Sequence, residues 1–375
     1  MANRIMLNQT SYHGAGAIAE IATEAKAHGF KKALVCSDPD LIKFNVTSKV
    51  TDILDKEGLA YEIYSDIKAN PTIENVQHGV QAFKNSGADY IIAIGGGSSM
   101  DTSKAIGIII ANPEFEDVRS LEGVAPTKKP SIPIIAVPTT AGTGSEVTCV
   151  AVLSDHELGK KGPIVSNGFY PSIAMIDPEL TYTLPPRITA STGIDVLCHA
   201  LEGFWSKGHQ PVCDALALHA CEIVFKYLRR AYKDPQDKEA RAKMAEASVI
   251  AGLAFTLPKT TSSHACSFPL TNLYHIPHGE ACGLTLDCFA RINAEVENGR
   301  VHEFARKLGF ADTYALADAI HELKVDLGLR LDLKDFNLTD EQVAELVKTS
   351  HHPNMLNNPV EITDEILNEM YQSMR

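Results

Sequence analysis

Three histidines and one aspartate in the second half of the chain have the types and spacing of metal ligands. Asp195 and His199 are four residues apart, which places both side chains on one face of a helix. His264 and His278 follow, fourteen residues apart. Pairs with a spacing of four are also common on ordinary surface helices, so this pair alone is weak evidence for a metal site. Together, carboxylate and imidazole ligands predict one site for a borderline divalent ion, Fe(II) or Zn(II), rather than Ca²⁺.

A glycine-rich loop in the first half has the chemistry of a phosphate site. The apolar run Asp89–Ile94 predicts a buried strand, and Gly95-Gly-Gly-Ser98 leads from it into a helical stretch. Glycines let the backbone approach a ligand closely, and the unpaired N–H groups of a helix start favour an anion. A tight turn without a ligand is the alternative.

A second polar loop, Pro138–Glu146, follows the next predicted strand. It contains the hydroxyls of Thr139, Thr140 and Thr143. Ligands of open parallel sheets bind at the carboxyl ends of the strands. Two such loops on successive strands therefore predict a site for a dinucleotide pyrophosphate.

The elements that must position these residues change in kind along the chain. In the first part, apolar runs alternate with helical spacing, which predicts a Rossmann-like parallel sheet covered on both faces. Beyond Thr183–Arg187 helical periodicity dominates. We expect an α/β dinucleotide-binding domain over residues 1–184 and an all-helical metal-binding and substrate domain over 185–375. The runs predicted as strands are Lys32–Ser37, Tyr61–Tyr64, Asp89–Ile94 and Ile132–Val137.

Composition narrows the class of protein. The 375 residues are 45% hydrophobic and 22% charged, as in globular proteins, and the net charge of −13 disfavours nucleic-acid binding. No apolar run is long enough to span a bilayer, and the start lacks a signal-peptide pattern. Eight cysteines without a C-x-x-C pair are typical of reduced thiols in a cytoplasmic protein. Cys198, Cys266 and Cys282 flank the predicted ligands, and we expect them to be small buried apolar residues.

Four motifs together resemble the iron-containing (group III) alcohol dehydrogenases. They are Gly95-Gly-Gly-Ser98-x-x-Asp101, Thr139-Thr-Ala-Gly-Thr-Gly-Ser-Glu146, Gly193-x-Asp195-x-x-x-His199-x-x-Glu202 and Pro277-His-Gly279. The resemblance spans both halves of the chain. It implies a dehydroquinate-synthase-like fold, with a nucleotide-binding α/β domain followed by a helical metal-binding domain, and an active site in the cleft between them.

The same resemblance implies roles for individual residues and partners. The four proposed ligands would bind the catalytic metal, Fe(II) first, with Zn or Mn as alternatives. Asn70 would line the adenine side of an NAD(H) site, and Lys161 would reach the ribose. Members commonly form homodimers or larger homo-oligomers. The residues implied at the pyrophosphate and nicotinamide ribose are Gly96, Gly97, Ser98, Asp101, Thr139, Thr140 and Thr143.

Asp38 predicts a preference for NADH over NADPH. It follows the strand Ala33–Ser37, where the adenosine ribose is expected, and a carboxylate there accepts from a 2′-hydroxyl and repels a 2′-phosphate. The alternative is an aspartate that forms a turn before Pro39.

The chain departs from the family at the position of a proton-relay histidine. Many members carry a histidine four residues after the third ligand, where this chain has Phe268. A phenyl ring cannot move protons. His275 is the candidate replacement, and a loop histidine without a catalytic role is the alternative.

A polar run before the third ligand bears on the substrate. Lys259-Thr260-Thr-Ser-Ser263 leads directly into His264, and the later run His351–Asn358 adds donors, Asn358 among them. A cation and hydroxyls suit an anionic head group, and the pattern is similar to family members that reduce sulfoacetaldehyde or phosphonoacetaldehyde. Hydroxyls that cap a helix are the alternative. We expect an enzyme that reduces such a two-carbon aldehyde.

Three other functions remain open. The N-terminal half resembles members that interconvert lactaldehyde and 1,2-propanediol, so a lactaldehyde or general short-chain alcohol dehydrogenase is the first alternative. A dehydroquinate-synthase-like lyase would need a more basic pocket than the sequence offers. The intact metal ligands and both phosphate loops argue against a sensor protein without catalytic turnover.

Overall fold

The computed structural model describes residues 5–155 and 160–375, with side chains except at Lys160, Lys161 and Asn298. The chain divides into two compact units. Unit 1 comprises Met1–Thr140 and Gly144–Tyr182, and unit 2 comprises Ala141–Thr143 and Thr183–Arg375. The main division therefore lies near the expected boundary at residue 184. The three-residue excursion into unit 2 was not predicted.

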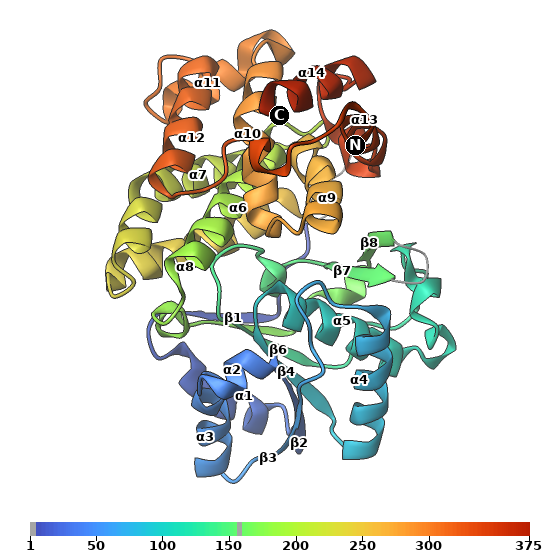
Figure 1. Ribbon diagram of the computed structural model, residues 1–375. Coiled ribbons are helices and arrows are strands. Elements are labelled where there is room, and N and C mark those ends of the chain that lie inside the picture. The colour runs from blue at the N-terminus through green and yellow to red at the C-terminus, as the bar shows by residue number, and fades with distance from the viewer. Residues whose placement is uncertain (1–4, 156–159) are drawn as a thin grey trace. The chain divides into compact units, whose positions relative to one another are not determined.

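Unit 1 is built on a parallel sheet (Figure 1), whose strands lie in the order β1-β9-β6-β4-β2-β3 within the described residues. Every neighbouring pair is parallel, which confirms the predicted fold class. The four predicted strands are present, and the edge strand β1 and the inner strand β9 were missed. The bounds are β1 Thr10–His13, β2 Lys32–Cys36, β3 Ala60–Tyr64, β4 Tyr90–Gly95, β6 Ile134–Pro138 and β9 Ile173–Ile176.

Helices cover both faces of this sheet because successive strand residues point to opposite sides. Ala33 and Val35 pack with α1 (Glu20–Ala27) and α3 (Ser48–Lys56) on one face. Leu34 and Cys36 pack with α4 (Ile73–Ser86) and α5 (Gly97–Ala111) on the other. Such near-continuous apolar strands are typical of a sheet buried on both sides.

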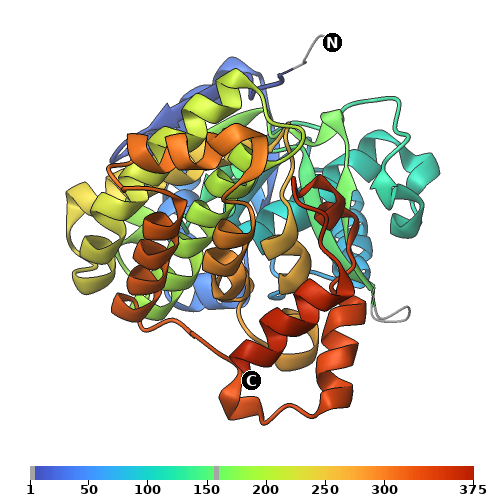
Figure 2. The same ribbon diagram turned by 90° about the horizontal axis from the view of Figure 1, so that it is seen from above.

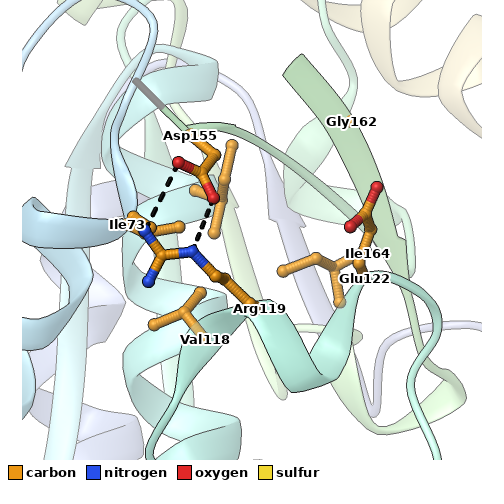
Figure 3. A pocket seen from close by; sticks show the side chains of 8 residues that line it. Ile73, Val118, Arg119, Glu122, Asp155, Gly162 and Ile164 are labelled. Atoms are coloured by element: carbon orange, nitrogen blue, oxygen red, sulfur yellow. Dashed lines mark hydrogen bonds and ion pairs between the residues drawn. The ribbon is translucent and has the colours of Figure 1, made fainter. Parts of the chain in front are cut away.

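A smaller sheet completes unit 1, with β5 (Gly123–Val124), β8 (Lys160–Val165) and β7 (Val150–Asp155) in that order. Figure 3 shows a hollow beside it, lined by Ile73, Val118 and Ile164, with the Arg119–Asp155 ion pair at 2.7 Å along its edge. None of the residues that line this hollow belongs to a predicted site.

Unit 2 is helical, as predicted. Its central helix α6 is buried along most of its length, and the red pair α13 and α14 pack side by side (Figure 2). The bounds are α6 Pro186–Trp205, α7 Pro211–Lys233, α8 Lys238–Phe255, α9 Ser262–Tyr274, α10 His278–Ile292, α11 Arg300–Lys307, α12 Thr313–Asp326, α13 Asp340–Thr349 and α14 Asp364–Met374. Among the described residues, no helix is both long and apolar enough to cross a membrane.

Candidate functional site

The two polar loops of unit 1 lie next to each other. Strands β4 and β6 are neighbours, and the Thr139 amide donates to the carbonyl of Gly95 at 2.9 Å. A Cβ on Gly96 would lie 3.4 Å from the hydroxyl oxygen of Thr140. Helix α5 begins at Gly97 without a side-chain cap, so its first N–H groups are available to an anion. Gly96, Gly97, Ser98 and Thr140 thus have the arrangement expected of a phosphate cradle.

Asp101 has a different position from the one expected. Its carboxylate accepts from the Ser145 hydroxyl at 2.7 Å and from the Val152 amide at 2.8 Å. The buried Lys104 also donates to Ser145, at 2.7 Å, and burial lowers the pKa of its ammonium while Asp101 raises it. Both carboxylate oxygens of Asp101 therefore bind protein groups. These bonds make Asp101 a link between α5, the second polar loop and β7, and its contact with the cofactor stays a prediction.

The remaining predicted cofactor residues lie on other segments of the chain. Asp38 is the N-cap of the short helix α2 (Pro39–Lys43) and accepts from the Leu41 amide at 3.0 Å. Asn70 is exposed, with a left-handed φ of 57°. Thr143 belongs to unit 2, and the side chain of Lys161 lies outside what the structure describes. Their contacts with the dinucleotide stay predictions.

Four potential ligand atoms in unit 2 form a tight cluster. They come from Asp195 on α6, His264 on α9, and His278 and Cys282 on α10, and all lie within 4.8 Å of one another. His199 is not in this group, although its ring lies beside that of His264, with centroids 4.6 Å apart. The structure thus brings together three of the four predicted ligands and adds a thiol that the sequence analysis treated as apolar filling.

Glu202, one helical turn beyond His199, orients His264. Its Oε2 accepts from Nδ1 of His264, and its Oε1 accepts from the Ser263 amide at 2.6 Å and the Thr261 hydroxyl at 2.9 Å. Nε2 of His264 is thereby directed to Asp195 Oδ1, 3.5 Å away. Such outer contacts fix the tautomer of a metal-binding imidazole. Glu202 appeared in the sequence motif, but its role could not be inferred from spacing.

Helix α10 approaches α6 closely at Gly279. A Cβ there would lie 2.0 Å from the carbonyl oxygen of Ser191 and 3.0 Å from the Cβ of Asp195. The Ser191 hydroxyl accepts from the Glu280 amide at 3.1 Å and caps the helix start. This close approach places His278, the first residue of α10, beside Asp195.

Burial and mutual contacts shift the pKa values of the groups in and beside the cluster. Burial raises the pKa of Asp195 to about 6, an effect that His264 and a hydrogen bond from the Cys282 thiol oppose. Burial, His264 and His278 lower the pKa of His199 well below its usual value, so its ring is neutral. Burial lowers the pKa of His264, but the contacts with Glu202 and Asp195 outweigh it and the net shift is upward.

Three buried atoms of this site have no hydrogen-bond partner among the described residues: Asp195 Oδ1, His199 Nδ1 and His264 Nε2. An unsatisfied buried polar group costs about 1–3 kcal/mol. A divalent ion would satisfy such oxygen and nitrogen lone pairs at once, so the residues present fit the predicted metal.

The predicted proton relay and substrate residues have mixed positions. His275 is exposed and forms the left-handed C-cap of α9, which argues against a relay role. Asn358 is fully buried, and its amide exchanges two hydrogen bonds of 2.9 and 3.0 Å with Asn293. Because that amide is already hydrogen-bonded to protein groups, Asn358 has a structural role and not the expected contact with the substrate. His352, within the predicted donor run His351–Asn358, packs against Phe268 with ring centroids 4.3 Å apart and planes inclined by 41°.

Comparisons with known proteins agree with this geometry. The family model for iron-containing alcohol dehydrogenases matches residues 8–178, and the model for the C-terminal domain of the same family matches residues 189–374. The chain belongs to the iron-containing alcohol dehydrogenase family. It is an NAD-dependent alcohol dehydrogenase or aldehyde reductase, as predicted. When bound, the metal of such an enzyme supplies a Lewis acid for the substrate oxygen.

Individual relatives cover the whole chain. Lactaldehyde reductase of Escherichia coli K12 is 40% identical over 382 residues, 100% of either chain. The crystal structure of sulfoacetaldehyde reductase from Bifidobacterium kashiwanohense in complex with NAD⁺ is 52% identical, with a TM-score of 0.93 and coverage of 100% and 99%. Alcohol dehydrogenase from Oenococcus oeni is 32% identical, with a TM-score of 0.95 and full coverage of both chains.

Proposed function

We propose that the enzyme uses NADH to reduce a two-carbon aldehyde that carries a sulfonate or phosphonate group. The observation that carries this proposal is a pair of buried hydroxyls directly before His264. Ser262 and Ser263 are fully buried, and neither hydroxyl has a hydrogen-bond partner among the described residues. Buried hydroxyls without partners are costly, and an anion in reach of them would supply acceptors.

Lys259 adds positive charge to the same segment. It lies three residues before Ser262, in a left-handed conformation with φ of 72°. A substrate bound to the metal through its aldehyde oxygen has its other end only a few bonds away. An ammonium and two hydroxyls in the segment that leads into His264 therefore suit an anionic head group.

A second segment of unit 2 packs on this run. Asn354 donates to the Thr260 hydroxyl at 2.8 Å, and Asn357 donates to the Thr260 carbonyl at 2.9 Å. These bonds connect His351–Asn358 to Lys259–Ser263, the two polar stretches singled out in the sequence. Since Thr260 accepts from Asn354, we infer that its main role is to fix the wall of the site.

The relatives offer two substrates. The 52% identical relative is a sulfoacetaldehyde reductase, which supports an anionic aldehyde. The 40% identical relative is a lactaldehyde reductase, which supports the alternative function as a lactaldehyde or propanediol oxidoreductase. The polar run before His264 favours the first.

The test compares four aldehydes with the metal-loaded enzyme by following NADH absorbance: sulfoacetaldehyde, phosphonoacetaldehyde, lactaldehyde and propionaldehyde. Lys259→Ala should lower kcat/KM for the anionic substrate by about 10–100-fold, as expected for loss of a charged hydrogen bond of ~1.5–3 kcal/mol. Propionaldehyde should be unaffected. Alanine retains the Cβ, so the backbone strain is unchanged. Lys233→Ala, at the end of α7, is the matched control.

Equal losses of kcat/KM for charged and neutral aldehydes in Lys259→Ala would contradict a role of Lys259 in substrate recognition. A wild-type preference for lactaldehyde would replace this proposal with the alternative.

A further inference from the structure

The centre of the second polar loop is held by residues of unit 2. Ala141 is buried in the core of that unit, and the amide of Gly142 donates to the hydroxyl of Ser248 on α8 at 2.9 Å. Thr140 and Thr143, which flank this buried pair, are both half-buried. The loop is therefore fixed at its middle, and its two partly exposed threonines lie on either side of the fixed point.

The fixed point lies in the seam between α6 and α8. Arg241 of α8 donates to the Thr189 hydroxyl of α6 at 2.7 Å, so the two helices are in direct contact there. Ser248 follows Arg241 by seven residues, or about two helical turns, and lies on the same face of α8. Thr192 follows Thr189 by three residues on α6. At this level of the seam, Gly142 packs against both helices.

Two features determine where Gly142 can lie. The first is its missing side chain, because a Cβ would lie 2.7 Å from the Cβ of Thr192 and 3.0 Å from the Thr192 carbonyl oxygen. That carbonyl belongs to the backbone of a largely buried helix and cannot move aside without cost. The second is the hydroxyl of Ser248, a residue only 2% exposed, which accepts from the Gly142 amide. Without this acceptor the buried N–H group would lose its hydrogen bond, which is costly.

We propose that Ser248 is a positioning residue for NAD(H), although it belongs to the helical unit. It acts through Thr140 and Thr143, the two predicted cofactor residues nearest to Gly142. A displacement of Gly142 must move both threonines, since each is at most two residues away along the chain. Thr140 in turn lies against Gly96 of the phosphate cradle, so the loss of the Ser248 hydroxyl would disturb that cradle as well.

Titration of the zinc-loaded protein with NADH, followed by fluorescence in the absence of aldehyde, measures this effect. Ser248→Ala should raise the Kd for NADH by about 5–10-fold, the factor expected for loss of one buried hydrogen bond. Gly142→Ala should raise it at least as much, because its Cβ would collide with Thr192. The zinc content of both variants should equal that of the wild type, because the clustered ligand atoms come from other residues.

Ser350→Ala is the matched control. This serine of unit 2 is also buried, and its hydroxyl hydrogen-bonds to the Tyr371 hydroxyl at 2.7 Å. Both serine variants should lower the midpoint of thermal unfolding, but only Ser248→Ala should weaken NADH binding. In steady-state assays Ser248→Ala should raise the KM for NADH and leave the KM for the aldehyde unchanged. A general loss of stability would not separate the two KM values in this way.

Wild-type affinity for NADH in Ser248→Ala would overturn the proposal. Equal losses of NADH affinity in Ser248→Ala and Ser350→Ala would do the same, because they would assign the effect to overall stability. Far-ultraviolet circular dichroism identifies a variant that fails to fold. If Ser248→Ala does so, Gly142→Ala decides the question, and wild-type NADH affinity in that variant would refute the role of the seam. The binding titration needs no aldehyde, so its result is separate from the choice of substrate.

Discussion

Replacing Glu202 with glutamine should weaken metal binding although Glu202 touches no metal. Oε1 of Glu202 accepts from the Thr261 hydroxyl and from the amides of Ser263 and His264, at 2.9, 2.6 and 3.3 Å. Glutamine retains that oxygen. Its NH₂ group, however, would face Nδ1 of His264, which now donates to Oε2. Two donors would then oppose each other.

His264 can relieve this conflict by moving its proton to Nε2, the nitrogen that faces Asp195 Oδ1 at 3.5 Å. That nitrogen would lose the lone pair that binds the metal. Loss of an outer contact of this kind typically costs 10–100-fold in metal affinity. The expected loss for Glu202→Gln is therefore ~1.4–2.8 kcal/mol.

The assay is a titration of the apo protein with zinc in competition with a chelator, together with the metal content of the purified protein. Because the Oε1 bonds remain, the unfolding free energy of the apo variant should fall by only about 1 kcal/mol. Asp287→Asn is the matched control. This buried carboxylate of α10 pairs with Lys324 at 2.6 Å, outside the cluster, so its change should lower stability but leave metal affinity unaltered. Wild-type affinity in Glu202→Gln would refute the reasoning.

Two further predictions concern stability. Burial raises the pKa of Glu146 from 4.5 to about 7, so the folded state retains a proton that the unfolded state releases, and stability falls by about 3 kcal/mol as pH rises from 4.5 to 7. Glu146→Gln should flatten that slope in denaturant titrations at several pH values, and an unchanged slope would contradict the assignment. Gly279→Ala should destabilise by about 1–3 kcal/mol in thermal unfolding, because its Cβ would lie 2.0 Å from the Ser191 carbonyl. Gly162→Ala, with its nearest atom at 3.8 Å, should be neutral, and equal effects would dismiss the clash.

The parts of the fold that sequence could predict are those with a strong local signal. Apolar runs such as Tyr90–Gly95 predicted central strands because these are buried on both faces. The edge strand Thr10–His13 alternates between half-buried and exposed residues over only four positions, too short to separate from a loop. The excursion Ala141–Thr143 depends on contacts with residues far along the chain, which no local pattern encodes.

The same distinction applies to the site. Asp195 and His264 could be predicted because their residue types and their spacing within motifs can be read directly from the sequence. Cys282 could not be recognised, since a thiol is equally common as buried filling, and only packing shows that it faces the cluster. The hydrogen bonds between the amides of Asn358 and Asn293 could not be predicted either, because the two residues are 65 positions apart in the sequence.

The excursion Ala141–Thr143 has a consequence for folding during synthesis. The amide of Gly142 donates to the hydroxyl of Ser248 at 2.9 Å, across 106 residues of sequence. At ~5–20 residues per second, translation delivers Ser248 about 5–20 s after Gly142. Unit 1 can begin to form as it leaves the ribosome, yet the second polar loop, with Gly142 at its centre, cannot reach its final conformation until the helical unit has emerged. A nascent chain arrested before Ser248 would thus have its sheet but an incomplete dinucleotide loop.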